Sequence, residues 1–230
     1  MANRKVPFVT GEHYHLYNRG IDKRNIFSNQ KDLDRFLQSM IEFNTLAPIG
    51  SIYENSFAQL GGETSKLKKA GKGKAEKLID FISYCINPNH YHFIVKQACE
   101  RGIEKFMHRL GTGYTMYFNE KEERSGSLFQ GVFKSIHVNS NEYLLHLSAY
   151  VNLNDRVHQL GGETSKLVKS KSSWGEYVGN ENANKGICEK DIILEQFKNR
   201  KEYKEFALES LEAIKQRKKE LEDIKEFLLE

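Results

Sequence analysis

The spacing of apolar residues along the chain switches between the periods of strands and helices. Apolar and polar side chains alternate over residues 13–19, as in a strand with one buried face, whereas apolar side chains recur every three or four positions over residues 32–43, as in a helix. Residues 78–86 and 90–97 are apolar and rich in β-branched and aromatic side chains, and an Asn-Pro-Asn sequence separates them. These two segments are predicted to form a hairpin.

A second helix and a fourth strand are predicted after the hairpin. Apolar side chains have helical spacing over residues 103–118, and they alternate with polar ones over residues 132–138. The order βαββαβ is that of the ferredoxin-like fold, in which two helices cover one face of an antiparallel sheet and the third strand lies beside the first. The sequence therefore predicts an α+β, ferredoxin-like fold.

Further helices are predicted in the C-terminal half. Asn139 has the position of an N-cap, and Glu142 follows three residues later as in a capping box, so an added helix should run to about residue 154. From about residue 189 the chain is charged and helical in pattern, with a partial Leu and Ile stripe that would pair with another chain or, as we prefer, pack on the domain. We expect a domain over residues 1–157, a linker over 158–188 and a C-terminal helical appendage over 189–230.

One nine-residue sequence, QLGGETSKL, occurs identically at residues 59–67 and 159–167. The sequences around the two copies differ, so they are inserts rather than structural repeats, and they suggest duplicated DNA within the coding sequence. The first copy leads into a stretch rich in Lys and Gly with few apolar side chains. This composition predicts a flexible, Lys-rich insert at about residues 55–76, for which we prefer a solvated linker to a phosphate-binding arm.

Composition limits the class of protein without selecting the function. With 230 residues and 39% hydrophobic content, the chain can bury at least one core. The net charge of +4 permits a nucleic-acid partner but does not require one. No segment approaches the roughly 18 apolar residues of a membrane span, and the first residues lack a signal-peptide pattern, so we expect no membrane partner and a cytoplasmic location. The cysteines, Cys85, Cys99 and Cys188, have neither disulfide-framework nor zinc-knuckle spacing.

Two predicted strands carry the same His-Tyr-His tripeptide. His13 and His15 lie on the first strand, and His90 and His92 lie on the third. Side chains two positions apart in a strand point to one face, so either pair could present two imidazoles to one metal ion. A pair alone is a weak signal, because two half-buried histidines with structural hydrogen bonds are the more common case. A third ligand would change this balance.

A tyrosine and an amide lie one helical turn apart on the added helix. Tyr150 and Asn154 are four residues apart, so their Cβ atoms should be about 5–6 Å apart. A phenol, with its pKa of about 10, attacks phosphorus poorly unless a metal polarises the phosphate. One ion held by His90, His92 and the Asn154 carbonyl would meet this need, and such a ligand set suits Mg²⁺ or Mn²⁺. On spacing alone, a simple core role for Tyr150 is favoured.

Four motifs in a fixed order resemble a known family over most of residues 11–154. They read HYHLYNRGIDKRNIF, NPNHYHFIVK, SGSLFQGVFKS and AYVNLN. The chain resembles the REP-associated tyrosine transposases, which are single-tyrosine transposases of the HUH endonuclease class. The resemblance implies that His90 and His92 are metal ligands, that Asn154 is the third ligand and that Tyr150 is the nucleophile. His13 and His15 match the family's first strand, which does not bear ligands.

The resemblance also implies a reaction and a substrate. It implies a metal-dependent endonuclease and strand transferase that cleaves single-stranded DNA near hairpins through a 5′-phosphotyrosine. Lys and Arg side chains would contact phosphates in a monomer or homodimer; the candidates are Arg19, Lys23, Arg24 and Lys134. The chain departs from the family at Asp155, where the family has proline, and at Val132, where it has arginine.

Two alternatives stay open from the sequence. The first is a non-cleaving protein derived from a transposase, which would keep the affinity for hairpin DNA. The second is a metal enzyme with four histidine ligands, which are His13, His15, His90 and His92. The second alternative arises because the first and third strands are expected to be neighbours.

Overall fold

A computed structural model describes residues 7–47, 50, 52, 76–157, 168–179 and 186–227, with side chains described as far as residue 220. The strands are β1 (His13–Arg19), β2 (Ile79–Asn87), β3 (His90–Gln97), β4 (Lys134–Val138) and β5 (Lys171–Ser172). The helices are α1 (Gln30–Glu42), α3 (Gly102–Lys121), α4 (Asn141–Asn152), α5 (Asn154–Val157), α6 (Trp174–Val178), α7 (Asp191–Leu194) and α8 (Arg200–Phe227), and a 3-10 turn, η1, covers Ile21–Lys23.

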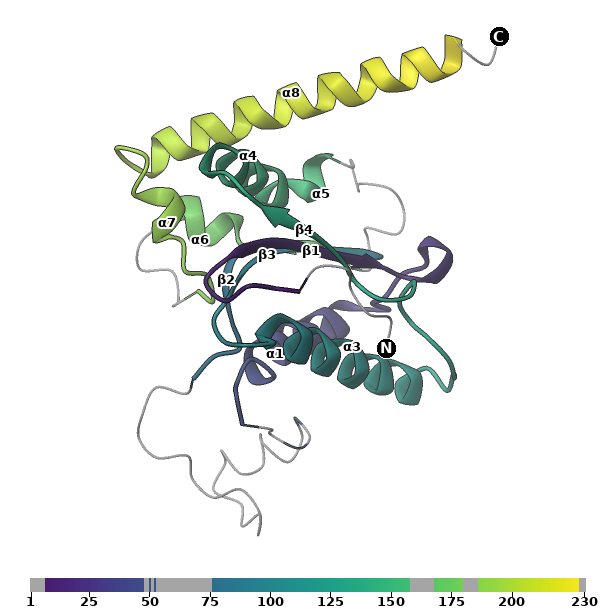
Figure 1. Ribbon diagram of the computed structural model, residues 1–230. Coiled ribbons are helices and arrows are strands. Elements are labelled where there is room, and N and C mark those ends of the chain that lie inside the picture. Colours follow the sequence, from purple (N-terminus) through teal and green to yellow (C-terminus); the bar gives the residue numbers. More distant parts are fainter. Residues whose placement is uncertain are drawn as a thin grey trace.

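The strands form one antiparallel sheet in the order β4-β1-β3-β2-β5. The third strand therefore lies beside the first, and the expected α+β, ferredoxin-like class is confirmed (Figure 1). A tight turn joins β2 to β3, so Asn87, the last residue of β2, pairs directly with His90, the first residue of β3. This register brings the Asn-Pro-Asn sequence to one end of the sheet.

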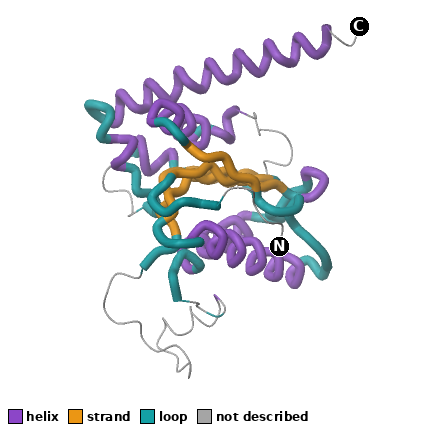
Figure 2. The backbone as a smooth tube through the Cα atoms, in the orientation of Figure 1, coloured by secondary structure: helices purple, strands orange, loops and turns teal. Residues whose placement is uncertain are grey.

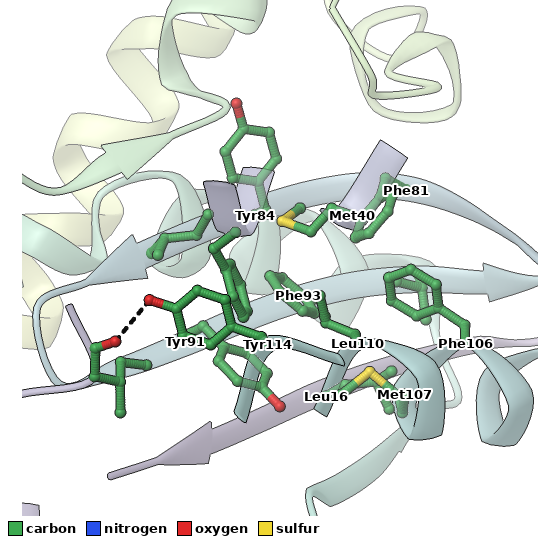
Figure 3. Packing of buried hydrophobic residues seen from close by; sticks show 14 of the residues in the cluster. Leu16, Met40, Phe81, Tyr84, Tyr91, Phe93, Phe106, Met107, Leu110 and Tyr114 are labelled. Carbon is green, nitrogen blue, oxygen red and sulfur yellow. Dashed lines mark hydrogen bonds between the residues drawn. The ribbon is translucent and has the colours of Figure 1, made fainter. Parts of the chain in front are cut away.

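Helices cover both faces of the sheet (Figures 1 and 2). Helices α1 and α3 lie on one face, and α4 and α8 lie on the other. Because side chains alternate along a strand, Tyr91 and Phe93 enter the core against α1 and α3, while His90 and His92 point toward α4. Figure 3 shows Tyr91 and Phe93 among side chains of that core. Burial on both faces fixes the register of β3, since a shift by one residue would exchange the two sets of side chains.

The added helix begins and ends differently from the prediction. Its N-cap is Ser140, whose side chain accepts a hydrogen bond from the backbone N–H of Tyr143, so the predicted cap at Asn139 is wrong by one residue. Both Asn139 and Ser140 carry a side-chain oxygen that can cap a helix, so the sequence alone could not choose between them. The helix ends at Asn152, and Leu153 has non-helical angles (φ −113°, ψ 17°) before Asn154 begins α5.

Part of the segment predicted to be a linker belongs to the fold. Strand β5 pairs with β2 at Cys85 and Ile86. Tyr177 of α6 is completely buried, and its hydroxyl donates to the carbonyl oxygen of Ile82 over 2.8 Å. A two-residue strand has no periodicity that a sequence pattern could reveal. Residues 55–75 of the predicted insert and both QLGGETSKL copies lie outside the described residues.

The C-terminal helix α8 packs against α4. Tyr203, Ala207 and Leu211 of α8 are buried in the second core, which also contains Leu147 and Val151 of α4. The apolar positions described in the first part of α8 are therefore covered by the same chain, as preferred from the sequence.

A buried polar network ties α4 to its surroundings. The Asn152 amide donates to the Tyr203 hydroxyl over 2.9 Å, and the Ser173 hydroxyl donates to Asn152 Oδ1 over 2.6 Å. The Ser148 hydroxyl donates its one proton to the Leu145 carbonyl. The Tyr203 hydroxyl, 3.2 Å from Ser148 Oγ, is therefore the donor in the contact between these two hydroxyls. The side chains of Asn152 and Tyr203 are both completely buried. The network fixes the end of α4 from which Tyr150 projects.

Candidate active site

The two histidines of β3 lie on the sheet face that α4 covers. His92 is 9% exposed and His90 is half-buried at the end of the strand. Their rings are 5.3 Å apart between centroids and nearly perpendicular. The alternation of the strand thus brings both imidazoles to one side, as the His-Tyr-His spacing predicted.

A chain of hydrogen bonds that begins at the backbone carbonyl of Lys23 determines which ring nitrogen of His90 carries the proton. Asn89 Nδ2 donates to the carbonyl oxygen of Lys23 over 3.1 Å, so Asn89 Oδ1, 2.6 Å from His90 Nδ1, is an acceptor. The neutral His90 ring therefore carries its proton on Nδ1 and an electron pair on Nε2. Asn87 Nδ2 lies 2.9 Å from this Nε2 and 2.8 Å from Asn154 Oδ1, and donates to both.

The Asn154 side chain brings a second electron-pair donor to His90. Asn154 is completely buried, and its Oδ1 lies 3.1 Å from His90 Nε2. Neither atom carries a proton, so they repel each other unless a positively polarised group contacts both. The Asn87 amide is such a group. Asn154 Nδ2 is buried without a hydrogen-bond partner among the described residues, so the Asn87 contact sets the orientation of the amide.

His92 is held by a histidine of the first strand. Its Nδ1 lies 2.9 Å from His15 Nε2, and His15 is 5% exposed. Burial lowers the pKa of His15 to about 4, so this ring is neutral at neutral pH. His13, in contrast, pairs with Lys96, four residues along β3 from His92, or about 13 Å at the rise of a strand. The structure does not bring His13 to the other three histidines.

Tyr150 projects from the end of α4 onto these rings. It is half-buried, and its ring centroid lies 5.6 Å from that of His92 and 6.4 Å from that of His15, with both pairs edge-on. Burial raises the pKa of Tyr150, and the neighbouring Asn154 amide opposes this by lowering it. The phenol is therefore protonated at neutral pH. The structure brings together all four residues expected at the catalytic and metal positions.

The donor atoms at this point fit a small divalent cation. In the described part of the chain, no group of three His, Cys, Asp or Glu side chains could hold a metal ion, so a site here needs the amide oxygen of Asn154. Adjacent ligands of an octahedral cation with bonds of about 2.1 Å are about 3 Å apart. The 3.1 Å between His90 Nε2 and Asn154 Oδ1 matches this separation. A cation bound there would replace the Asn87 amide as the positively polarised group that contacts both atoms. Imidazole nitrogen and amide oxygen are both ligands that divalent cations take in proteins.

The comparison with protein families finds one similar family. The family described as "Transposase IS200 like" matches residues 62–154, a range that contains His90, His92, Tyr150 and Asn154. This segment of the chain is similar to the IS200-like transposases. The resemblance to single-tyrosine transposases seen in the sequence motifs is thereby confirmed.

Other comparisons are more distant. The structure is similar to the one described as "Structure of the REP associates tyrosine transposase bound to a REP hairpin", with a TM-score of 0.46 and 9% sequence identity. This similarity covers 82% of the present chain and 98% of that chain. No curated protein matches the chain. Within the described ranges, no helix of the chain is both long and apolar enough to cross a membrane.

The four residues expected to contact DNA surround the end of the sheet that carries His90. Arg19 pairs with His90 across β1 and β3, and its guanidinium donates to the side chain of Gln130. Lys134 pairs with Tyr17 across β1 and β4. Lys23 and Arg24 lie in and directly after η1, where Arg24 is 3.8 Å from Asp22. All four side chains are exposed.

Asn87 and His15 are contacts of the site that the motifs did not single out as functional. A hairpin with a two-residue turn places the residue before the turn opposite the one after it, so the register alone would have pointed to Asn87. The adjacent strands likewise bring His15 near His92. His15 lies opposite Ile94, so its contact with His92 is diagonal and not evident from pairing.

The two departures from the family pattern, at positions 155 and 132, have different structural settings. The backbone N–H of Asp155 donates to the Cys85 thiol, and a proline at position 155 could not make this bond. Cys85 pairs with His92 across β2 and β3, so the contact lies directly beside the candidate site. Val132 is 63% exposed before β4, and the structure gives no reason for its substitution.

Proposed function

We propose that the chain is a metal-dependent single-stranded DNA endonuclease and strand transferase. The observation that carries the proposal is the convergence of the Tyr150 ring, two imidazoles and the Asn154 amide oxygen on one sheet face. The match to a transposase family over the segment that supplies these residues supports a reaction at DNA phosphates.

Tyr150 is the nucleophile in the proposed reaction. Its hydroxyl oxygen forms a bond to a backbone phosphorus, and the bond from that phosphorus to the 3′ oxygen breaks. The tyrosine loses its proton and the departing oxygen gains one, giving a 5′-phosphotyrosine and a free 3′-hydroxyl. The phosphodiester energy is kept in the phosphotyrosine, so another 3′-hydroxyl can reverse the step without ATP. Cleavage and rejoining are thus one reaction in two directions.

Three residues would hold the divalent cation, Mg²⁺ or Mn²⁺, and these are His90, His92 and Asn154. When bound, the cation would polarise the scissile phosphate. The Asn154 amide also lies beside the Tyr150 hydroxyl, where it lowers the pKa that burial raises. The buried network behind α4 orients the tyrosine before DNA arrives.

The proposed substrate is single-stranded DNA near a hairpin, as the motif resemblance implies. Arg19 and Lys134 flank the two histidines on the same sheet face and would contact phosphates, as would Lys23 and Arg24 beside the hairpin turn. Tyr17, half-buried and stacked on His92 with ring centroids 5.6 Å apart, is placed to stack on an unpaired base.

A covalent-adduct assay tests the proposal. Purified protein is mixed with 3′-labelled single-stranded hairpins from the flanks of its gene, with Mn²⁺, Mg²⁺ or EDTA, and label is sought on denatured protein. Tyr150→Phe is compared with Tyr143→Phe, which removes another hydroxyl from the same helix, two turns away. We expect metal-dependent label on the wild type and Tyr143→Phe and none on Tyr150→Phe.

Other outcomes would contradict the proposal in different ways. Label that persists in Tyr150→Phe would mean that another residue is the nucleophile. Hairpin binding without an adduct under any metal would favour the non-cleaving DNA-binding protein.

A further inference from the structure

His15 contacts the proposed cation ligand His92 from the neighbouring strand. We propose that His15 is a positioning residue that holds the His92 ring with its proton on Nδ1, so that Nε2 presents an electron pair to the cation. This inference rests on the cation site of the proposed function. His15 itself would not be a ligand, because its Nε2 is engaged with His92 Nδ1 at 2.9 Å.

The short distance allows only two proton arrangements. Either His92 Nδ1–H donates to His15 Nε2, or His15 Nε2–H donates to His92 Nδ1. In the second arrangement the neutral His92 carries no proton on Nδ1, so its Nε2 carries one and cannot bind a cation. Only the first arrangement gives a ligand, and it requires His15 to be the acceptor.

The other histidine of the pair shows the same pattern. His90 donates its Nδ1–H to Asn89 Oδ1, which leaves the electron pair on Nε2, beside Asn154, where Asn87 Nδ2 donates to it. Each histidine thus has a partner at Nδ1, an amide for His90 and an imidazole for His92. Ligating histidines generally need such a partner to fix their tautomer and orientation.

Ring packing restricts the His92 plane as well. The rings of His15 and Tyr17 are nearly parallel to that of His92, at 22° and 19°, with centroids 5.1 Å and 5.6 Å away. Tyr150 meets the same ring edge-on at 82°. His15 therefore controls both the protonation of His92 and the direction in which Nε2 points.

Three variants separate this role from simple packing. His15→Phe keeps a flat ring but removes the acceptor, whereas His15→Gln restores an acceptor oxygen. His13→Phe is the matched control, because His13 lies on the same strand and face but pairs with Lys96, and its Nε2 is buried without a hydrogen-bond partner among the described residues. Mn²⁺ binding to each protein is measured by titration calorimetry, without DNA.

We expect Mn²⁺ binding to be about 10- to 100-fold weaker in His15→Phe, which is the usual loss when the partner of a ligating histidine is removed. His15→Gln should recover much of the lost affinity, and His13→Phe should bind Mn²⁺ as tightly as the wild type. Absence of binding by the wild type would overturn the proposed cation site, and this inference with it. Binding by His15→Phe equal to that of the wild type would overturn this inference alone.

Nuclear magnetic resonance of the metal-free wild type tests the inference without any variant. Two-bond ¹H–¹⁵N spectra distinguish the two neutral tautomers of a histidine. We expect both His90 and His92 to carry the proton on Nδ1, and His92 to lose this preference in His15→Phe. A wild-type His92 protonated on Nε2 would overturn the inference.

Discussion

Removal of the Tyr203 hydroxyl tests whether α8 holds the tyrosine-bearing helix α4 in place. In Tyr203→Phe the ring keeps its packing, but the Asn152 amide loses the acceptor that now lies 2.9 Å away. Both residues have no exposed surface, so water cannot replace the lost oxygen. Asn152 Oδ1 keeps its bond from Ser173, and the stranded amide N–H is the main loss.

The expected cost follows from this count of lost bonds. Leaving a buried donor without a partner costs about 1–3 kcal/mol, and no apolar area is lost, so we expect about 2 kcal/mol. For a chain of this length, each kcal/mol lowers the midpoint of thermal unfolding by about 2–4 °C, which gives a decrease of about 4–8 °C. Urea denaturation would report the change as a lower free energy of unfolding at an unchanged m-value.

Two comparisons make the interpretation specific. Tyr143→Phe removes a hydroxyl from a half-buried ring at the start of α4 and should change stability by less than about 0.5 kcal/mol. In an Asn152→Ala background, Tyr203→Phe should cost much less, because no amide is left to strand. A Tyr203→Phe cost of about 2 kcal/mol in the Asn152→Ala background, or no cost in the wild type, would refute the assignment of this cost to the stranded Asn152 amide.

The same hydroxyl should make stability depend on alkaline pH. Burial raises the pKa of Tyr203 to about 12, although Ser148 and Asn152 oppose the shift. Between the ordinary tyrosine pKa of about 10 and this raised value, the unfolded chain binds fewer protons than the folded one, so stability falls as pH rises. The stability difference between the wild type and Tyr203→Phe should therefore narrow through this window.

Two further predictions concern the opposite face of the sheet. Gly111→Ala should stabilise α3 by about 0.5–1 kcal/mol, because a Cβ there meets no atom within 4 Å. Gly113→Ala should destabilise the protein, because its Cβ would lie 2.8 Å from the Phe43 ring. Equal midpoints of thermal unfolding for the two variants would contradict both expectations. Burial raises the pKa of Asp32, but hydrogen bonds, first that from Lys121, lower it by more, so the net pKa is below its ordinary value. Asp32→Asn should therefore cost about 1–3 kcal/mol of stability at neutral pH. The depressed pKa means that this stability is lost as pH falls below about 4, where urea titrations of the two proteins should converge.

The sequence could predict the strands more closely than the helix that carries Tyr150. Residues 13–19 and 90–97 coincide with β1 and β3, because alternation over a strand with two differently covered faces leaves little freedom. The start of α4 could not be fixed, since Asn139 and Ser140 offer equivalent capping oxygens. The break at Leu153 likewise follows from packing rather than from a Pro or Gly signal.

The site could be predicted only as far as its motifs extend along the chain. His90, His92, Tyr150 and Asn154 follow from residue spacing together with the family resemblance. The geometry that joins them depends on contacts between strands, such as the double hydrogen bond from Asn87. Such contacts leave no periodic trace in a sequence, because they depend on the turn geometry of a hairpin and on which amide atom faces inward.

The described part of the C-terminal region completes the candidate site from behind. The strands orient His90 and His92, but the helix that bears Tyr150 rests on side chains from α6, its N-cap Ser173 and α8 as well as on the sheet. Asn152 is the point where these elements meet, and it lies two residues from Tyr150 and two from Asn154. A shift of α8 would therefore move Tyr150 and Asn154 together, while leaving the two histidines in place.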